Sequence, residues 1–273
     1  MPYLNFDGLQ IAYHEQGSGQ PVLLVHCSGD SHRQWQFVDK LLPDCRLIAP
    51  DLIGYGDSDP WPEGQPMPAD TDARMLDELM QQIDQPIHVI AHSYGAASLL
   101  NAVARQIRDR RLQVISLFLI EPVCFNLLDQ PTHQSQWQQI LAMQQRSRAY
   151  AQAGDLDRVA DLFMGFWLGD QVWQQMPHGY RQAVISTMPK VAQEFNALDQ
   201  AADIRPELGQ ITCPVSLLRG EHSPQPARIV AELLAEMIPG AQLADMAGAG
   251  HMIPQTRPEE LSQLILRFRQ NYW

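Results

Sequence analysis

The chain has 273 residues, of which 45% are apolar and 18% charged, and this composition favours a folded globular protein over a disordered one. Its formal net charge of −12 argues against nucleic acid and anionic membrane surfaces as partners, because both require a basic face on the protein. The length is sufficient for one α/β domain that carries an insertion.

Short apolar runs bounded by Gly, Pro and Asp alternate with helical patterns along most of the chain. The opening segment predicts a β-hairpin, because Asp7-Gly8 suits a tight turn between two short strands. Most of the later runs are continuously apolar, which is typical of strands buried on both faces. The expected strands are 3–6, 9–15, 21–26, 45–50, 87–91, 114–120, 215–219 and 241–245, and the expected helices are 33–42, 70–83, 96–111, 227–237 and 259–269.

This alternation predicts an α/β protein with a mostly parallel sheet of eight strands and helices on both faces. Ligands bind such sheets at the carboxyl ends of the strands. One stretch, residues 125–206, breaks the alternation, because it contains helical segments rich in Gln, Trp and Met but no convincing strand. We interpret it as a helical cap, called the cap segment below, inserted into a core domain formed by residues 1–124 and 207–273.

The clearest motif follows the fifth expected strand, where Ala91-His92-Ser93-Tyr94-Gly95 leads directly into a helix. Small residues at positions 91 and 95 permit a sharp strand-to-helix turn, and that turn exposes the serine oxygen. Backbone N–H groups at the start of the helix point toward the same place. The motif therefore predicts Ser93 as a nucleophile.

A second motif, Gly248-Ala249-Gly250-His251, lies between the last strand and the last helix. A serine hydroxyl is a poor nucleophile at neutral pH and needs an imidazole within hydrogen-bond reach. An isolated histidine in such a loop would be interpreted as an ordinary surface residue. Because Ser93 also follows a strand at the same edge of the sheet, we predict that His251 is its base.

An acyl-transfer site also requires two N–H donors that stabilise the oxyanion of the tetrahedral intermediate. One donor normally adjoins the nucleophile, and the other comes from a neighbouring loop after a strand. The backbone N–H groups of Tyr94 and Ser28 fit these two positions. We expect His26 to organise the loop around Ser28.

These motifs resemble those of the α/β-hydrolases that carry a cap, a group that includes esterases, lactonases, haloalkane dehalogenases and carbon–carbon bond hydrolases. The segment Asp51-Leu52-Ile53-Gly54-Tyr55-Gly56-Asp57-Ser58 resembles the family's D-x-x-G-x-G-x-S loop, and the similarity covers nearly the whole chain. The resemblance implies the α/β-hydrolase fold with a helical cap over the active site. Family members commonly have His-Gly where this chain has His26-Cys27, and this departure predicts an oxyanion loop of different shape.

The acid of the expected Ser–His–acid triad is missing from its usual position. Ser223 stands where the family usually has an Asp, and a serine cannot stabilise an imidazolium as a carboxylate does. We predict that Glu121 is the acid, because an ionisable residue at the end of so apolar a strand needs a partner. Some haloalkane dehalogenases of this fold take their acid from the same strand end. Glu221, two positions before Ser223, is the alternative.

The residues together predict a serine hydrolase that cleaves an ester, thioester or lactone of a small, largely apolar substrate through an acyl-enzyme. A carbon–carbon bond hydrolase of a diketone-like substrate is an alternative, since it uses the same residue types. A ligand-binding protein without catalysis and a cofactor-independent oxygenase are the remaining alternatives. We expect Trp35, Phe166 and Trp167 to contact the substrate, and we expect no cofactor and no metal ion.

The cysteines and residues 1–20 indicate in which cellular compartment we expect the protein. Cys27, Cys45, Cys124 and Cys213 are widely spaced beside apolar runs, which predicts buried free thiols in a reducing environment. Residues 1–20 lack the basic-then-apolar pattern of a signal peptide, and no apolar run is long enough to span a bilayer. We therefore expect a cytoplasmic monomer or homodimer that acts on small molecules without membrane insertion.

Overall fold

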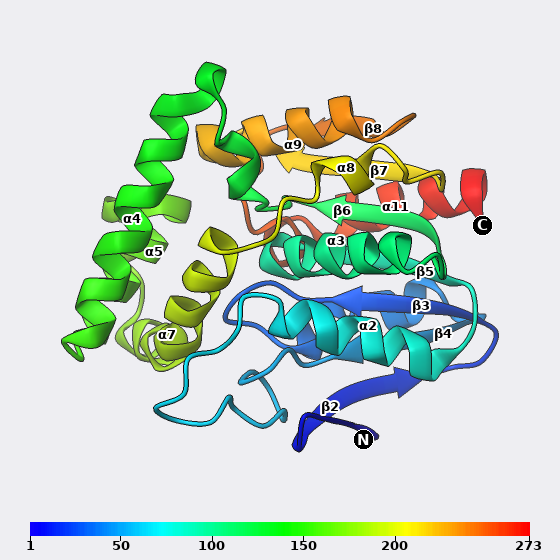
Figure 1. Ribbon diagram of the computed structural model, residues 1–273, viewed down its shortest axis with the longest axis horizontal. Helices are drawn as coiled ribbons and strands as arrows, with labels where there is room; N and C mark the ends of the chain where they lie inside the picture. Colours follow the sequence, from blue (N-terminus) through cyan, green and yellow to red (C-terminus); the bar gives the residue numbers. More distant parts are fainter.

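The computed structural model describes residues 1–273 and contains one sheet of eight strands in the order β1-β2-β4-β3-β5-β6-β7-β8 (Figure 1). The strands are β1 (Tyr3–Phe6), β2 (Leu9–Gln16), β3 (Gln20–Val25), β4 (Cys45–Pro50), β5 (Ile87–His92), β6 (Val114–Ile120), β7 (Val215–Gly220) and β8 (Gln242–Met246). Each predicted strand is confirmed to within one residue at either end. The sheet is mixed, because β2 pairs antiparallel with both β1 and β4 while every other pairing is parallel.

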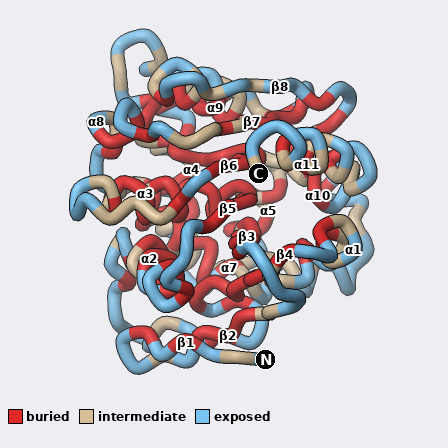
Figure 2. The backbone as a smooth tube through the Cα atoms, turned by 90° about the vertical axis from the view of Figure 1, so that its right-hand side faces the viewer, coloured by how far each residue is buried: buried red, intermediate tan, exposed pale blue.

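The centre of the sheet is covered on both faces, as the apolar runs predicted. Alternate residues of β3 show the division: Leu23 and Val25 pack in the core on one face, and Val22 and Leu24 pack in the core on the other. Figure 2 shows β3, β5 and β6 as a buried centre. β8 differs from the expectation of a buried strand, because it lies at the sheet edge and leaves most of its side chains partly or fully exposed.

Helices cover the two faces unequally. The first face carries α2 (Thr71–Ile83), α3 (Ser93–Arg108) and α9 (Gln225–Met237), whose apolar sides join one large core, and α8 (Arg205–Leu208) packs nearby. The second face carries α1 (Val38–Leu41) and α11 (Pro258–Tyr272), with α10 (Ile253–Thr256) before α11. The helix expected over 33–42 is instead two short pieces, the 3₁₀ turn η1 (His32–Trp35) and α1.

The cap segment lies beyond the carboxyl ends of the central strands (Figure 1). It contains no strand, as predicted, and its elements are η2 (Phe125–Leu128), η3 (Pro131–His133), α4 (Gln134–Gln152), α5 (Leu156–Leu168), α6 (Asp170–Gln174) and α7 (His178–Asp199). Helices α5, α6 and α7 share a small apolar core of their own around Trp173 and Met188. The cap helices are therefore held against one another by their own apolar core.

All four cysteines carry free thiols, and three of them are buried while Cys213 is half-buried. Burial raises the pKa of the Cys124 thiol to about 12, so that this group stays protonated at neutral pH. No helix of the structure combines the length and the apolar character that crossing a bilayer requires.

Candidate active site

Ser93 stands on a strained turn between β5 and α3. Its backbone φ is 55°, in the left-handed region that residues with a side chain rarely occupy. The turn also requires a glycine two residues later, because a Cβ on Gly95 would collide with the backbone carbonyl oxygen of His26. The β5 strand is completely buried up to this point, so the turn is held by packing on all sides.

The loops after three strands bring together three side chains that the sequence predicted as a set. Ser93 Oγ lies 2.8 Å from His251 Nε2, and His251 Nδ1 lies 2.8 Å from Glu121 Oε2. Because a carboxylate can only accept, Nδ1–H of His251 donates to Glu121 and leaves Nε2 to accept from the serine hydroxyl. The three residues are 4%, 3% and 1% exposed, so water competes little for these bonds.

Glu121 is held so that one carboxylate oxygen faces the histidine. Its backbone φ is 50°, a second strained position at the carboxyl edge of the sheet. The other oxygen, Oε1, accepts hydrogen bonds from Gly220 N–H at 2.5 Å and from the Ser223 hydroxyl at 2.8 Å. Ser223, which stands where the sequence analysis expected an Asp, therefore donates a hydrogen bond to the Glu121 carboxylate.

The alternative acid, Glu221, points elsewhere. Its carboxylate accepts a hydrogen bond from the Gly248 N–H at 2.8 Å, and the residue is exposed to solvent. No hydrogen bond or ion pair joins it to His251. Of the two carboxylates weighed from the sequence, only Glu121 contacts the histidine.

Ser28 and Tyr94, the residues predicted to supply the oxyanion donors, lie near Ser93. Tyr94 is the second residue of α3, where a helical N–H has no acceptor within the helix. Ser28 lines the cavity that contains Ser93 and His251. His26 braces the loop: its Nδ1–H donates to the Cys27 carbonyl at 2.7 Å, and its Nε2 accepts from Leu52 N–H at 2.9 Å. Burial lowers the pKa of His26, consistent with this neutral form.

Two polar residues that sequence reasoning did not assign also support the site. His92 donates from Nε2 to the backbone carbonyl of His251 at 3.0 Å, and its burial lowers its pKa well below the usual value. Asp51 is fully buried and accepts hydrogen bonds from the His32 backbone at 2.7 Å and from the Asp57 backbone at 2.9 Å. The D-x-x-G-x-G-x-S resemblance pointed to Asp51, but nothing in the sequence indicated a role for His92.

A cavity of about 280 Å³ lies over Ser93 and His251, between the carboxyl ends of the central strands and the cap segment. Its wall is mainly apolar and comes largely from α5 and α7, with Phe163, Met164, Trp167, Val184 and Met188 among the lining residues. The indole of Trp167 stacks on the His251 imidazole, with ring centroids 3.5 Å apart and planes 14° from parallel. Trp167, which we expected to contact the substrate, therefore lines the cavity and also contacts His251.

The two other predicted substrate contacts are corrected by the structure. Trp35 is 1% exposed and packs in the core under α1 and α11, because the turn of η1 directs its ring into the sheet face. Phe166 packs edge-on against Trp167 and Phe125, so its ring belongs to the aromatic packing of the cap. Neither residue lines the cavity at Ser93.

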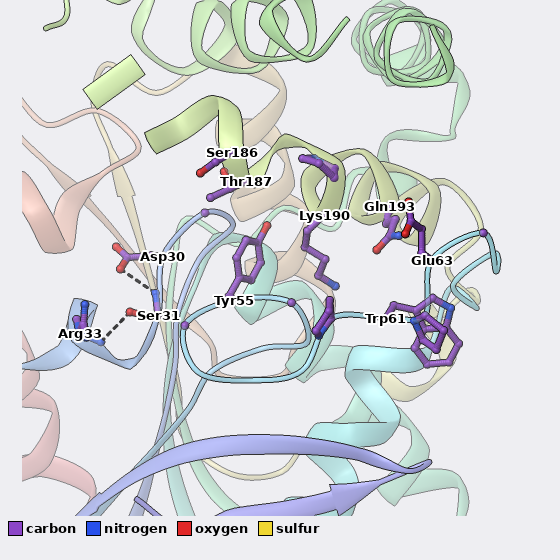
Figure 3. A pocket seen from close by; sticks show the side chains of 17 residues that line it. Asp30, Ser31, Arg33, Tyr55, Trp61, Glu63, Ser186, Thr187, Lys190 and Gln193 are labelled. Atoms are coloured by element: carbon purple, nitrogen blue, oxygen red, sulfur yellow. Dashed lines mark hydrogen bonds between the residues drawn. The ribbon is translucent and has the colours of Figure 1, made fainter. Parts of the chain in front are cut away.

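A larger and more polar cleft of about 900 Å³ adjoins the first cavity, and the two share Gly29, Asp30 and Thr187 (Figure 3). It lies between α7 and the loop after β4. Figure 3 shows Lys190 extending from α7 toward that loop, with Tyr55 beside it and Trp61 at the far side.

Comparisons with known proteins agree with this architecture. A family model described as the alpha/beta hydrolase family matches residues 22–264. Lipase LipV of Mycobacterium tuberculosis is 27% identical over 256 residues, which cover 89% of this chain and 91% of the lipase. The pimeloyl-(acyl-carrier protein) methyl ester esterase of Yersinia enterocolitica is 28% identical over 269 residues, covering 96% of this chain and 98% of the esterase.

A solved structure of an esterase from Thermogutta terrifontis aligns with a TM-score of 0.76 at 22% identity, covering 97% of this chain and 94% of that one. At this identity the likeness concerns the fold. The family model, in contrast, spans most of the chain and includes the turn at Ser93 and the loop at His251. The chain belongs to the alpha/beta hydrolase family, and with its lipase and esterase relatives it is a hydrolase.

Proposed function

We propose that the protein is a serine hydrolase that cleaves a carboxylic ester, thioester or lactone through an acyl-enzyme on Ser93. The observation that supports this most directly is the chain of two 2.8 Å hydrogen bonds from Ser93 through His251 to Glu121 in a buried site. This is the geometry by which a histidine removes the serine proton as the oxygen attacks a carbonyl carbon.

In the proposed cycle Ser93 Oγ adds to the substrate carbonyl while its proton passes to His251 Nε2. The backbone N–H groups of Ser28 and Tyr94 bind the resulting oxyanion. As the tetrahedral intermediate collapses, the bond from the carbonyl carbon to the leaving oxygen or sulfur breaks and His251 gives its proton to that atom. An ester or thioester thus releases an alcohol or thiol, a lactone keeps the new hydroxyl on its acyl chain, and Ser93 remains acylated. Water, deprotonated by His251, then releases the acid and regenerates the serine, while Glu121 stabilises the imidazolium in both halves.

The size and lining of the cavity favour a small apolar group at the reacting end of the substrate. A volume of about 280 Å³ is at the lower limit of typical small-molecule sites. The lipase and methyl ester esterase among the relatives support an ester as the bond cleaved. We therefore expect short-chain esters to be turned over faster than long-chain esters.

Covalent labelling with diethyl p-nitrophenyl phosphate tests the proposal. Ser93 should displace p-nitrophenolate, and the mass gain of a diethylphosphoryl group should map to the peptide that contains Ser93. The wild type should also hydrolyse p-nitrophenyl butyrate, and Ser93→Ala should lose about 10⁴-fold or more of kcat and resist labelling. A wild-type protein that neither labels nor turns over any short-chain ester would overturn the proposal.

A further inference from the structure

Helix α7 of the cap segment directs two buried charged side chains at the core, Lys190 and Glu194. They are four residues apart, so they lie on one face of the helix. Lys190 is 7% exposed and Glu194 is 2% exposed, and charged side chains of these types are almost never so buried without partners. The partners on the core side therefore indicate what the pair does.

Lys190 reaches one residue of the predicted oxyanion hole through a single carboxylate. Its Nζ donates to Asp72 Oδ2 at 2.6 Å, and the Tyr94 hydroxyl donates to the same oxygen at 2.7 Å. The ammonium group also lies 5.7 Å from the centre of the Tyr94 ring. Tyr94 is thus held at its side chain by α2 and α7 while its backbone N–H adjoins Ser93.

Glu194 lies beside the other predicted oxyanion residue. Burial raises the pKa of Glu194 to about 7, whereas the charge of Lys190 and the nearby hydroxyls of Ser28 and Tyr55 lower it. Neither carboxylate oxygen makes a hydrogen bond of standard geometry, and the buried Tyr55 hydroxyl also lacks one. The Glu194 carboxyl is therefore buried without a hydrogen bond that would hold the Ser28 loop.

We propose that Lys190 is a positioning residue through which the cap segment sets one of the two oxyanion donors, the backbone N–H of Tyr94. The proposal rests on the proposed function and deepens it. An oxyanion hole works only if its donors are fixed before the charge develops, and a buried network of this kind supplies that rigidity. The cap helix thus contributes to transition-state binding without touching the substrate carbonyl.

The proposal predicts a loss in kcat with little change in KM. Lys190→Met should lower kcat for p-nitrophenyl butyrate by about tenfold to a hundredfold, because small displacements of catalytic groups are costly. The affinity for a trifluoromethyl ketone should fall by a similar factor, because its adduct with Ser93 carries the same oxyanion. KM should stay within about twofold, since the apolar cavity is unchanged.

A milder variant keeps the test valid if the buried Asp72 carboxylate, left without its cation, prevents Lys190→Met from folding. Tyr94→Phe removes only the hydrogen bond to Asp72, and it should reproduce the loss of kcat and of ketone affinity.

The matched control is Arg148→Met, which breaks an ion pair within the cap, 3.1 Å from Asp199 near the end of α7. Arg148 makes no hydrogen bond to Asp72, Tyr94 or Ser28. It should leave kcat and ketone affinity within about twofold. Wild-type turnover and labelling of Ser93 are measured first, so that failure of the proposed function is recognised separately. If the wild type is active and the Lys190 and Tyr94 variants both behave like the control, the positioning role is wrong.

Discussion

The carboxyl edge of the sheet and the cap segment that faces it position their side chains in different ways. At the sheet edge, Ser93 and Glu121 hold strained backbone angles, and their positions follow from loops of fixed shape after buried strands. In the cap, Trp167 and Lys190 lie on ordinary helices and reach His251 and Asp72 only because of how those helices pack. In the proposed function the carboxyl edge of the sheet supplies the reacting groups, and the cap holds them in place.

This difference predicts a difference in the size of mutational effects. Removing a reacting group from the edge should lose orders of magnitude in rate. Removing a cap side chain should lower the rate by about tenfold to a hundredfold, and part of the effect should appear in the free energy of unfolding.

The largest effect that tests this comparison is expected for Glu121. Glu121→Gln should lower kcat by a factor on the order of 10³ to 10⁴, because a neutral amide cannot stabilise the imidazolium or enforce the required tautomer. Steady-state hydrolysis of p-nitrophenyl butyrate measures it. The matched control is Glu221→Gln, which alters a carboxylate bound only to Gly248 and should stay within about twofold. Equal losses in the two variants would remove the distinction between the two acids.

A smaller effect is expected from the cap residue stacked on His251. Trp167→Leu should lower kcat/KM by about tenfold, because the aromatic face both holds the imidazole and stabilises its charged form in the transition state. Trp167→Phe should recover most of this loss, since it restores an aromatic face.

Phe166→Leu provides the control for Trp167, because Phe166 packs against the indole without lining the cavity. It should change kcat/KM by less than about threefold. If Trp167→Leu and Phe166→Leu lower kcat/KM by the same factor, the stacking of Trp167 on His251 contributes only to the packing of the cap. In that case the difference between the effects of edge residues and cap residues on the rate is larger than we predict.

The smallest effect is one of stability and depends on pH. The folded protein holds the pKa of Glu194 at about 7, above its usual value near 4.5, mainly through burial. Between these two values the folded chain binds the proton more tightly than the unfolded chain, so this residue makes stability fall as pH rises. Relative to the wild type, Glu194→Gln should therefore gain stability from pH 5 to pH 8, by no more than about 3 kcal/mol.

Urea unfolding of both proteins across this pH range measures that difference. Other titrating groups contribute equally to both proteins, so the comparison with Glu194→Gln cancels their contributions. One such group is His88: burial lowers its pKa to about 4, so its contribution to the protein's stability falls as pH falls. A wild-type-minus-variant difference that does not change with pH would show that the Glu194 carboxyl titrates near its ordinary value.

The sequence by itself determined the parts of this protein that depend on local pattern. Continuous apolar runs located the eight strands, and small residues around Ser93 identified the turn, because both signals lie within a few neighbouring residues. Strand order then placed Ser93, Glu121 and His251 at one edge, since parallel strands end on the same side of a sheet. The choice of Glu121 over Glu221 came from the apolar strand that Glu121 ends, where an ionisable group needs a partner, and from the resemblance to some haloalkane dehalogenases.

Only the tertiary structure decided which cap side chains meet the core. A helical pattern shows which face of α7 turns inward, but not that Lys190 meets Asp72, which lies 118 residues earlier in the chain. For the same reason Trp35 proved to be a core residue, Trp167 a neighbour of His251, and Ser223 a hydrogen-bond donor to Glu121. These contacts depend on how separately folded elements pack together, and no local spacing encodes that packing.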